Sequence, residues 1–165
     1  MLHKVSIAGM TMDPASNTPI IILKTETDDR MIPIWIGLLE ATSIASVLQN
    51  IKLDRPMTHD LFKNLLDRFQ IGVERIEVCD LKENTFYAQI HFTSDGQTFQ
   101  MDSRPSDAIA IALRFNAPIY IDEKVIEKSQ RGYEEGEILD KSKKGKEWAD
   151  YLAGLSPEDF GKFKV

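Results

Sequence analysis

The sequence has a single cysteine, Cys79, among its 165 residues. One thiol excludes an intrachain disulfide and any zinc site built on several cysteines, and it fits a reducing compartment. The chain also lacks an apolar run of the roughly 20 residues that a membrane-spanning helix needs. Residues 1–5 turn polar too soon to begin a signal peptide. We therefore expect a cytoplasmic protein that makes no membrane contact.

Basic residues are in the minority, with 20 Lys and Arg against 26 Asp and Glu, and the formal net charge is −6. Such a chain repels a phosphate backbone on average, so any contact with nucleic acid requires a local basic patch or a metal ion. The sequence also has no glycine-rich phosphate loop, dinucleotide fingerprint, H-E-x-x-H pair or G-x-S-x-G elbow. The chain is therefore not expected to be a nucleotide-binding protein, zinc protease or serine hydrolase of the kinds that these motifs mark.

What is present is the pattern of an α+β domain. Hydrophobic residues make up 42% and charged residues 28% of the chain, which is an ordinary globular balance. Alternating or β-branched apolar runs predict strands over residues 4–7, 19–24, 31–36, 73–79, 86–92, 99–101 and 117–121. Apolar residues at helical spacing predict helices over residues 41–48, 58–69, 105–113 and 122–126. Pro33 has no N–H, which places its strand at a sheet edge or at a bulge.

The two halves of the chain share one order of elements: strand, hairpin, helix. Glu40-Ala41 aligns with Asp107-Ala108 at the start of a helix in each half, a match that either a duplication or chance explains equally well. We expect a curved, mixed, mainly antiparallel sheet packed with helices. A sheet that closes into a barrel-like form is one alternative. This domain should cover residues 1–130, and residues 131–165 should form a charged linker and a C-terminal amphipathic helix.

The densest polar motif covers residues 102–107, at the start of the predicted helix 105–113. The free N–H groups and the positive end of a helix dipole favour anions there. Arg104 can bind a carboxylate or a phosphate through two N–H groups, and Ser106 can cap the helix or bind substrate. The alternative is that the motif only caps the helix and forms an internal Arg104–Asp107 pair, because an ionic cluster beside an apolar helix must be paired.

A second polar motif covers residues 55–60. His59 has the side chain suited to act as a general base or metal ligand near neutral pH, and the neighbouring Asp60 could hold a divalent ion. Arg55 adds a cation that could bind substrate. The alternative is that Thr58 caps the helix, Asp60 complements its dipole and His59 is merely exposed.

Glu40 and Asp107 form a third candidate site if the two helix starts are equivalent. Paired carboxylates bind Mg²⁺ or Mn²⁺ through their oxygens, and a metal ion allows phosphodiester hydrolysis with few basic residues. The alternative is that each acid satisfies only its own helix terminus. His3 and His91 have no acidic cluster beside them in sequence, and we interpret both as structural.

Several motifs occur together and in a familiar order. They are Ile34-Trp35-Ile36-Gly37 with Glu40-Ala41, Arg55-Pro56 with Thr58-His59-Asp60, Thr85-Phe86-Tyr87-Ala88, and Ser103-Arg104-Pro105-Ser106-Asp107-Ala108-Ile109-Ala110. They resemble the bifunctional nuclease domain family over about residues 1–128. The resemblance implies an α+β fold with a curved antiparallel sheet and, by likeness to plant members, nuclease activity on DNA and RNA. Residues 155–162 look like the tail of bacterial members.

The resemblance carries over motif positions but no agreed set of catalytic residues, so each role is a hypothesis. We assign catalysis to Glu40, His59, Asp60 and Asp107, substrate binding to Arg55, Arg104 and Ser106, and a divalent cation, Mg²⁺ or Mn²⁺, to Glu40 and Asp107. The expected function is metal-assisted hydrolysis of DNA or RNA that is weak and depends on the cation. The alternative is a non-catalytic oligomeric interaction or regulatory domain, and a small-anion-binding module is a third reading.

Two further expectations concern assembly and stability. A stripe of Trp148, Tyr151, Leu152 and Leu155 has the composition of an interface anchor, which predicts a homo-oligomer. If Arg104 forms a buried pair, its replacement by alanine should cost on the order of 3–5 kcal/mol. Convergence of Glu40, His59, Arg104 and Asp107 on an open site would favour catalysis or anion binding, and a closed buried pair would favour a structural role.

Overall fold

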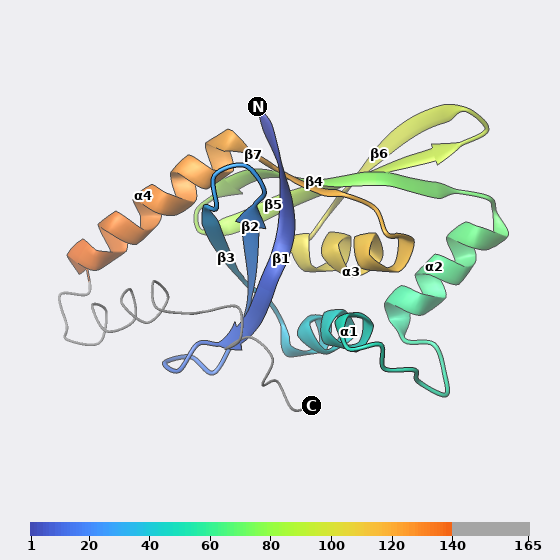
Figure 1. Cartoon of the computed structure of the whole chain (residues 1–165), viewed down its shortest axis with the longest axis horizontal. Coiled ribbons are helices and arrows are strands. Elements are labelled where there is room, and N and C mark those ends of the chain that lie inside the picture. The colour runs from blue at the N-terminus through green and yellow to red at the C-terminus, as the bar shows by residue number, and fades with distance from the viewer. Residues whose placement is uncertain (140–165) are drawn as a thin grey trace.

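The computed structural model describes residues 1–139, which form one mixed sheet and four helices (Figure 1). The elements follow in the order β1 (Leu2–Met12), β2 (Pro19–Thr25), β3 (Met31–Trp35), α1 (Leu38–Leu48), α2 (Thr58–Arg68), β4 (Gly72–Lys82), β5 (Thr85–Ser94), β6 (Gln97–Ser103), α3 (Pro105–Phe115), β7 (Ile119–Asp122) and α4 (Glu123–Leu139). The fold is α+β, as the sequence predicts.

The sheet has the order β3-β2-β1-β7-β4-β5-β6, so its two halves are arranged alike on either side of β7. β1 pairs with β7 antiparallel and β4 pairs with β7 parallel, while every other neighbouring pair is antiparallel. The mixed, mainly antiparallel sheet with two strand–hairpin–helix halves is confirmed. Barrel-like closure is wrong, because β3 and β6 remain as open edges among the described residues.

The strand that contains Pro33 is one of these edges, as its missing N–H predicts. Pro33 lies opposite Ile22 in a regular antiparallel register with β2. The two longest strands, β1 and β4, both contain register shifts. Bulges of this kind bend a strand and increase its twist, which gives the sheet the curvature visible in Figure 1.

Helix α3 is the centre of the helical layer. It contacts α1, α2, β4 and β5, and its residues 108–112 are all buried. A helix that is apolar on every side has to be covered on every side, and the packing of α1 and α2 against it meets that requirement. Pro105 is the first helical residue, where its missing N–H costs nothing.

Two helix boundaries differ from the sequence-based expectation. Thr58 is the first residue of α2 and not its cap; the cap is Met57, whose backbone N–H donates to Asp60 Oδ2 at 2.9 Å. The Asp60 carboxylate, at the third helical position, thus accepts the N–H of the cap residue, which is the reciprocal half of a capping box. Helix α4 continues to Leu139, whereas the sequence predicted a short helix over residues 122–126. The stripe at residues 148–155 lies outside the described residues.

Among residues 1–139, none of the helices combines the length and apolar composition that crossing a membrane requires.

Candidate functional site

Helices α1, α2 and α3 each carry an acid in the first turn, as their third residue: Glu40, Asp60 and Asp107. A negative charge is favourable there because the backbone N–H groups of the first turn have no partner within the helix. Glu40 and Asp107 occupy equivalent positions in the two halves of the fold, as their alignment in sequence predicts. The helix termini therefore determine where the acids lie, and side chains between the helices determine what they bind.

Arg104 joins two of these acids. It is the cap residue of α3, with extended backbone angles. Its Nε donates to Asp107 Oδ2 at 2.6 Å and its Nη2 to Asp107 Oδ1 at 3.1 Å. Nη2 also lies 2.8 Å from Glu40 Oε1, on the neighbouring helix α1. One guanidinium therefore holds the N-termini of α1 and α3 together through two carboxylates.

His59 extends this network into the protein. Its Nε2 lies 2.9 Å from Asp107 Oδ1, and its Nδ1 lies 2.8 Å from Ser43 Oγ. An ionised carboxylate can only accept a hydrogen bond, so Nε2 carries the proton. In the tautomer with its single proton on Nε2, Nδ1 accepts a hydrogen bond from the Ser43 hydroxyl. Ser43 is 1% exposed, so this buried serine shields Nδ1 from water.

These five residues, Glu40, Ser43, His59, Arg104 and Asp107, form what we call the Arg104 cluster. Exposure of their side chains falls from Arg104 at 66% through Asp107 at 27% to His59 at 14%. Burial opposes the ionisation of Asp107, but hydrogen bonds from Arg104 and His59 outweigh it and hold the pKa of the carboxyl below its ordinary value. The cluster is thus an ionised network with a solvent-facing cation at its outer end.

Asp60 binds a different, buried arginine, Arg114, which touches the Arg104 cluster only at the backbone of Ser43. Arg114 Nε donates to Asp60 Oδ1 at 2.6 Å, and Arg114 Nη2 donates to the Ser43 backbone oxygen at 3.3 Å. The Arg114 side chain is only 4% exposed. Burial opposes the ionisation of Asp60, but the Arg114 and Met57 donors lower its pKa. Asp60 therefore caps α2 and anchors it to α3, with no oxygen directed at the Arg104 cluster.

Sequence reasoning missed Ser43 and Arg114, although spacing along the helices contained a signal for both. Ser43 follows Glu40 by one helical turn on α1, and Arg114 follows Asp107 by two turns on α3. Residues at such spacings share one helix face, so each lies on the face of the candidate acid beside it. A search along those faces would have found both residues.

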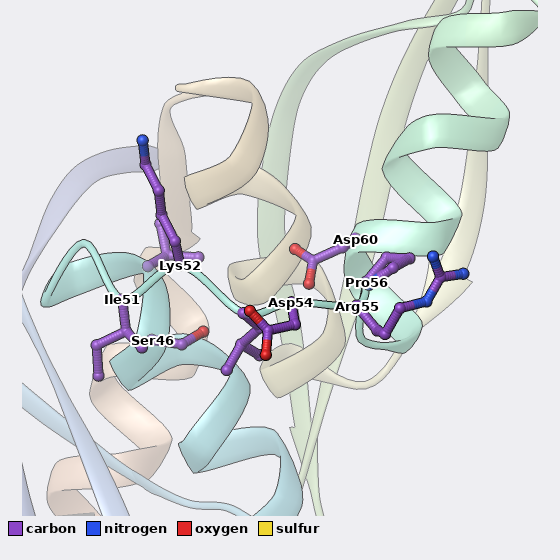
Figure 2. A pocket seen from close by; sticks show the side chains of 9 residues that line it. Ser46, Ile51, Lys52, Asp54, Arg55, Pro56 and Asp60 are labelled. Atoms are coloured by element: carbon purple, nitrogen blue, oxygen red, sulfur yellow. The ribbon is translucent and has the colours of Figure 1, made fainter.

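Within residues 1–139, the side chains of Arg55 and Ser106 make no hydrogen bond or ion pair with the Arg104 cluster. Arg55 lines a pocket of about 380 Å³ between the end of α1 and the start of α2. Figure 2 shows its guanidinium turned away from the pocket, while the carboxylates of Asp54 and Asp60 border it. Ser106 is 6% exposed in the first turn of α3. Lys52 also lines the pocket, so its lining holds two basic and two acidic residues and has no net positive charge to attract a phosphate.

The arrangement of Glu40 and Asp107 does not fit a resident metal ion. The Arg104 guanidinium lies between their carboxylates and bonds to both, in the place that a shared cation would need. Within residues 1–139, no three or more His, Cys, Asp or Glu side chains are gathered so that they could hold a metal ion. The expected Mg²⁺ or Mn²⁺ stays a prediction that no contact in this part of the chain supports.

Comparison with known proteins gives the family. Residues 21–133 match the model of the bifunctional nuclease domain. An uncharacterized protein of Mycobacterium tuberculosis (strain H37Rv) is 33% identical over 164 residues, which cover 96% of this chain and 98% of that protein. The chain belongs to the bifunctional nuclease domain family.

Plant relatives match over a shorter region. Bifunctional nuclease 1 of Oryza sativa subsp. indica is 24% identical over 116 residues, 68% of this chain and 35% of the rice protein. Bifunctional nuclease 1 of Arabidopsis thaliana is 26% identical over 123 residues, 73% of this chain and 38% of that protein. The similarity therefore reaches about a third of each plant protein.

Proposed function

We propose that this protein binds and hydrolyses the phosphodiester backbone of nucleic acid at the Arg104 cluster. The observation that carries the proposal is the exposure of Arg104, whose side chain is 66% accessible while two carboxylates hold it in place. Its Nη1 has no hydrogen-bond partner among the described residues. An oriented guanidinium with free N–H groups is suited to bind a phosphate. Family membership and the plant nucleases named above support the choice of nucleic acid.

The chemistry follows from what a phosphate would displace. A phosphate that takes the Nη2 hydrogen bond from Glu40 would free that carboxylate. Glu40 could then accept a proton from a water molecule whose oxygen attacks phosphorus, while the ester bond breaks and solvent protonates the leaving oxygen. His59 acts here as a positioning residue for Asp107, because both of its ring nitrogens are already engaged.

A second candidate function is phosphate recognition without hydrolysis. It is favoured by the closed pattern of the cluster, in which Asp107 and both nitrogens of His59 have partners within the protein. The net charge of −6 also limits how strongly the chain attracts nucleic acid. Binding that depends on Arg104, with no cleavage under any condition, would decide for this candidate.

The test measures binding and cleavage of a labelled single-stranded oligonucleotide, as DNA and as RNA. Loss of one phosphate contact should lower the slope of log affinity against log salt by about one. We expect that change, with loss of cleavage, for Arg104→Ala. Arg68→Ala removes the same charge from an exposed position at the end of α2 and should leave both properties unchanged. Equal effects of the two variants would reject Arg104 as the phosphate ligand.

Cation dependence is tested in the same assay. The sequence predicts that cleavage requires added Mg²⁺ or Mn²⁺, because the acidic chain cannot neutralise several phosphates by itself, whereas the step at Glu40 described above needs no bound ion. Undiminished cleavage in excess EDTA, lost in Arg104→Ala protein purified in parallel, would reject cation dependence and keep the site. Cleavage that persists in Arg104→Ala would point to a contaminating nuclease or to another site.

A further inference from the structure

Within residues 1–139, strand β6 is an open edge without the proline, lysine or bulge that protects many edge strands. Its residues from Gln97 to Asp102 are all exposed. It contains neither proline nor lysine, and its register with β5 has no shift. Natural edge strands use proline, lysine or bulges to prevent pairing with another chain. The opposite edge, β3, contains Pro33, so only one of the two edges is blocked in this way.

One face of β6 is apolar, and no other part of residues 1–139 covers it. Phe99 and Met101 lie opposite Phe92 and Ile90 of β5, and the Phe99 ring stacks on Phe92 with centroids 5.2 Å apart. Phe92 and Ile90 are 1% and 4% exposed, whereas Phe99 and Met101 are 43% and 52% exposed. In Figure 1 the β5–β6 hairpin extends beyond the helices. Apolar and polar residues thus alternate along β6 as they do in a half-buried strand, but no described residue buries the apolar ones.

The hairpin geometry fixes which backbone groups of β6 are free. Its turn, Asp95-Gly96, has positive φ at both residues, and Ser94 and Gln97 form the closing pair. In such two-residue turns the closing pair is hydrogen-bonded, and hydrogen-bonded and open pairs then alternate along the strands. Gln97 and every second residue after it therefore bond to β5. Thr98, Gln100 and Asp102 direct their backbone N–H and C=O groups to the open edge.

We propose that β6 is a dimerisation edge, at which two copies of this chain pair β6 with β6 in antiparallel fashion about a twofold axis at Gln100. In this register Gln100 faces itself, Thr98 faces Asp102, and Phe99 faces Met101. All three outward-directed residues of each copy find partners. The only charged residue of the strand lies opposite a threonine, so no like charges meet. The four apolar side chains join into one cluster on the helix-covered side of the sheet.

A second copy fits this edge better than nucleic acid does. Residues 85–103, which form the whole hairpin, contain no lysine or arginine and include Asp95 and Asp102. A phosphate backbone would be repelled here and would gain no counter-charge. The dimer is independent of the proposed function, because the Arg104 cluster contributes no contact to it. It would place the two Arg104 residues on the same side of the joined sheet, about 27 Å apart along the strands.

A site-directed disulfide tests the register to a single residue. In the Cys79→Ser background, which removes the native thiol, Gln100→Cys would place two cysteines in a facing pair with Cα atoms about 5.5 Å apart, within reach of a disulfide. Thr98→Cys in the same background is the matched control, because the two copies of that position would lie about 14 Å apart. We expect oxidation to give a dimer with Gln100→Cys only. Cross-linking of neither variant, or equal cross-linking of both, would overturn the register.

Light scattering coupled to size exclusion tests the dimer itself. We expect the wild-type chain to approach twice 18.8 kDa in the micromolar range. Gln100→Lys places two lysines face to face and should weaken association about tenfold or more; circular dichroism checks that its fold is unchanged. Gln130→Lys makes the same change at an exposed position on α4 and should have no effect. A monomeric wild type, or an oligomer that Gln100→Lys leaves intact, would overturn the proposal.

Discussion

The Arg104 cluster has a counterpart elsewhere in the chain that uses the same kinds of side chain. Arg30 donates from Nη1 and Nη2 to the two Glu123 oxygens at 2.6 and 2.9 Å, and His3 Nε2 faces the same carboxylate. His3 is 13% exposed, close to the 14% of His59. The two arginines differ: Arg30 is 22% exposed and Arg104 is 66% exposed. A histidine, an acid and an arginine in contact therefore do not by themselves distinguish a functional site from a structural salt-bridge network.

A third group of the same composition supports this conclusion. His91 Nε2 lies 3.1 Å from Glu77 Oε1, and Arg75 Nε donates to the same oxygen at 2.6 Å. Arg75 is 31% exposed. Every histidine of the chain therefore lies against a carboxylate that also binds an arginine. All three arginines also bind a second acid, which is Asp28 for Arg30, Glu74 for Arg75 and Glu40 for Arg104, so what sets the Arg104 cluster apart is that its arginine is mostly exposed.

The counterpart also differs in what it connects. Arg30 and Glu123 lie 93 residues apart in sequence, so their pair joins the start of β3 to the start of α4. Arg104 and Asp107 lie within one helix start, and only the bonds to Glu40 and His59 reach other helices. We expect the first pair to contribute more to stability and the second to contribute more to activity.

The largest expected difference concerns cleavage. Arg104→Ala should lower it about a hundredfold, as loss of an oriented donor to a developing negative charge does elsewhere. Arg30→Ala should leave cleavage unchanged at temperatures where the variant is folded. Rates of oligonucleotide cleavage under single-turnover conditions check this. A larger loss in Arg30→Ala than in Arg104→Ala would reverse the assignment of the two groups.

Stability should show the opposite order. Arg30→Ala leaves Glu123 without its two-bond partner and should cost about 1–3 kcal/mol. Arg104→Ala should cost about 1 kcal/mol or less, because an exposed ion pair contributes little. The cost of 3–5 kcal/mol expected from the sequence required a buried pair, and the exposure of Arg104 removes that condition. Urea unfolding of both variants measures the difference, and equal midpoints would contradict it.

A smaller effect tests how Glu40 is held. A Cβ atom at Gly37 would collide with Glu40 Oε2, although the extended backbone of Gly37 suits alanine. Gly37→Ala should therefore displace the carboxylate from Arg104 and lower cleavage by about tenfold or less. In a Glu40→Gln background the same substitution should have little further effect. Additive losses would show that Gly37 acts through something other than Glu40.

The smallest expected effect is on acid stability. The pKa of Asp107 is below its ordinary value of 3.8 in the folded protein. Its ionisation therefore stabilises the fold above pH 3.8, and this contribution is lost as the pH falls through the lowered folded value. Glu123 behaves alike, because hydrogen bonds from Arg30 lower its pKa. Asp107→Asn and Glu123→Gln should each flatten the decline of the urea midpoint between about pH 4 and pH 2. If the urea midpoint of either variant declines with pH as steeply as that of the wild type, the replaced carboxylate does not contribute to acid stability.

Local patterns predicted the elements well, and they placed three acids correctly at helix starts. The reason is that capping and helix dipoles act within one turn, so residues near in sequence decide them. The same local patterns did not predict the hydrogen-bond partners of these acids. Asp60 turned out to bind Arg114, 54 residues away, and no local signal distinguishes that acid from Glu40 or Asp107.

The sequence by itself determined the α+β class, the edge or bulge position of Pro33, the apolar character of α3 and the acids at the helix N-termini. These depend on periodicity, on missing N–H groups and on the free groups of helix ends, all of which are short-range. Only the tertiary structure decided that Arg104 bridges two acids while staying exposed and that, within residues 1–139, the sheet stays open and β6 is uncovered. These features depend on which surfaces packing leaves to solvent, and long-range contacts settle that.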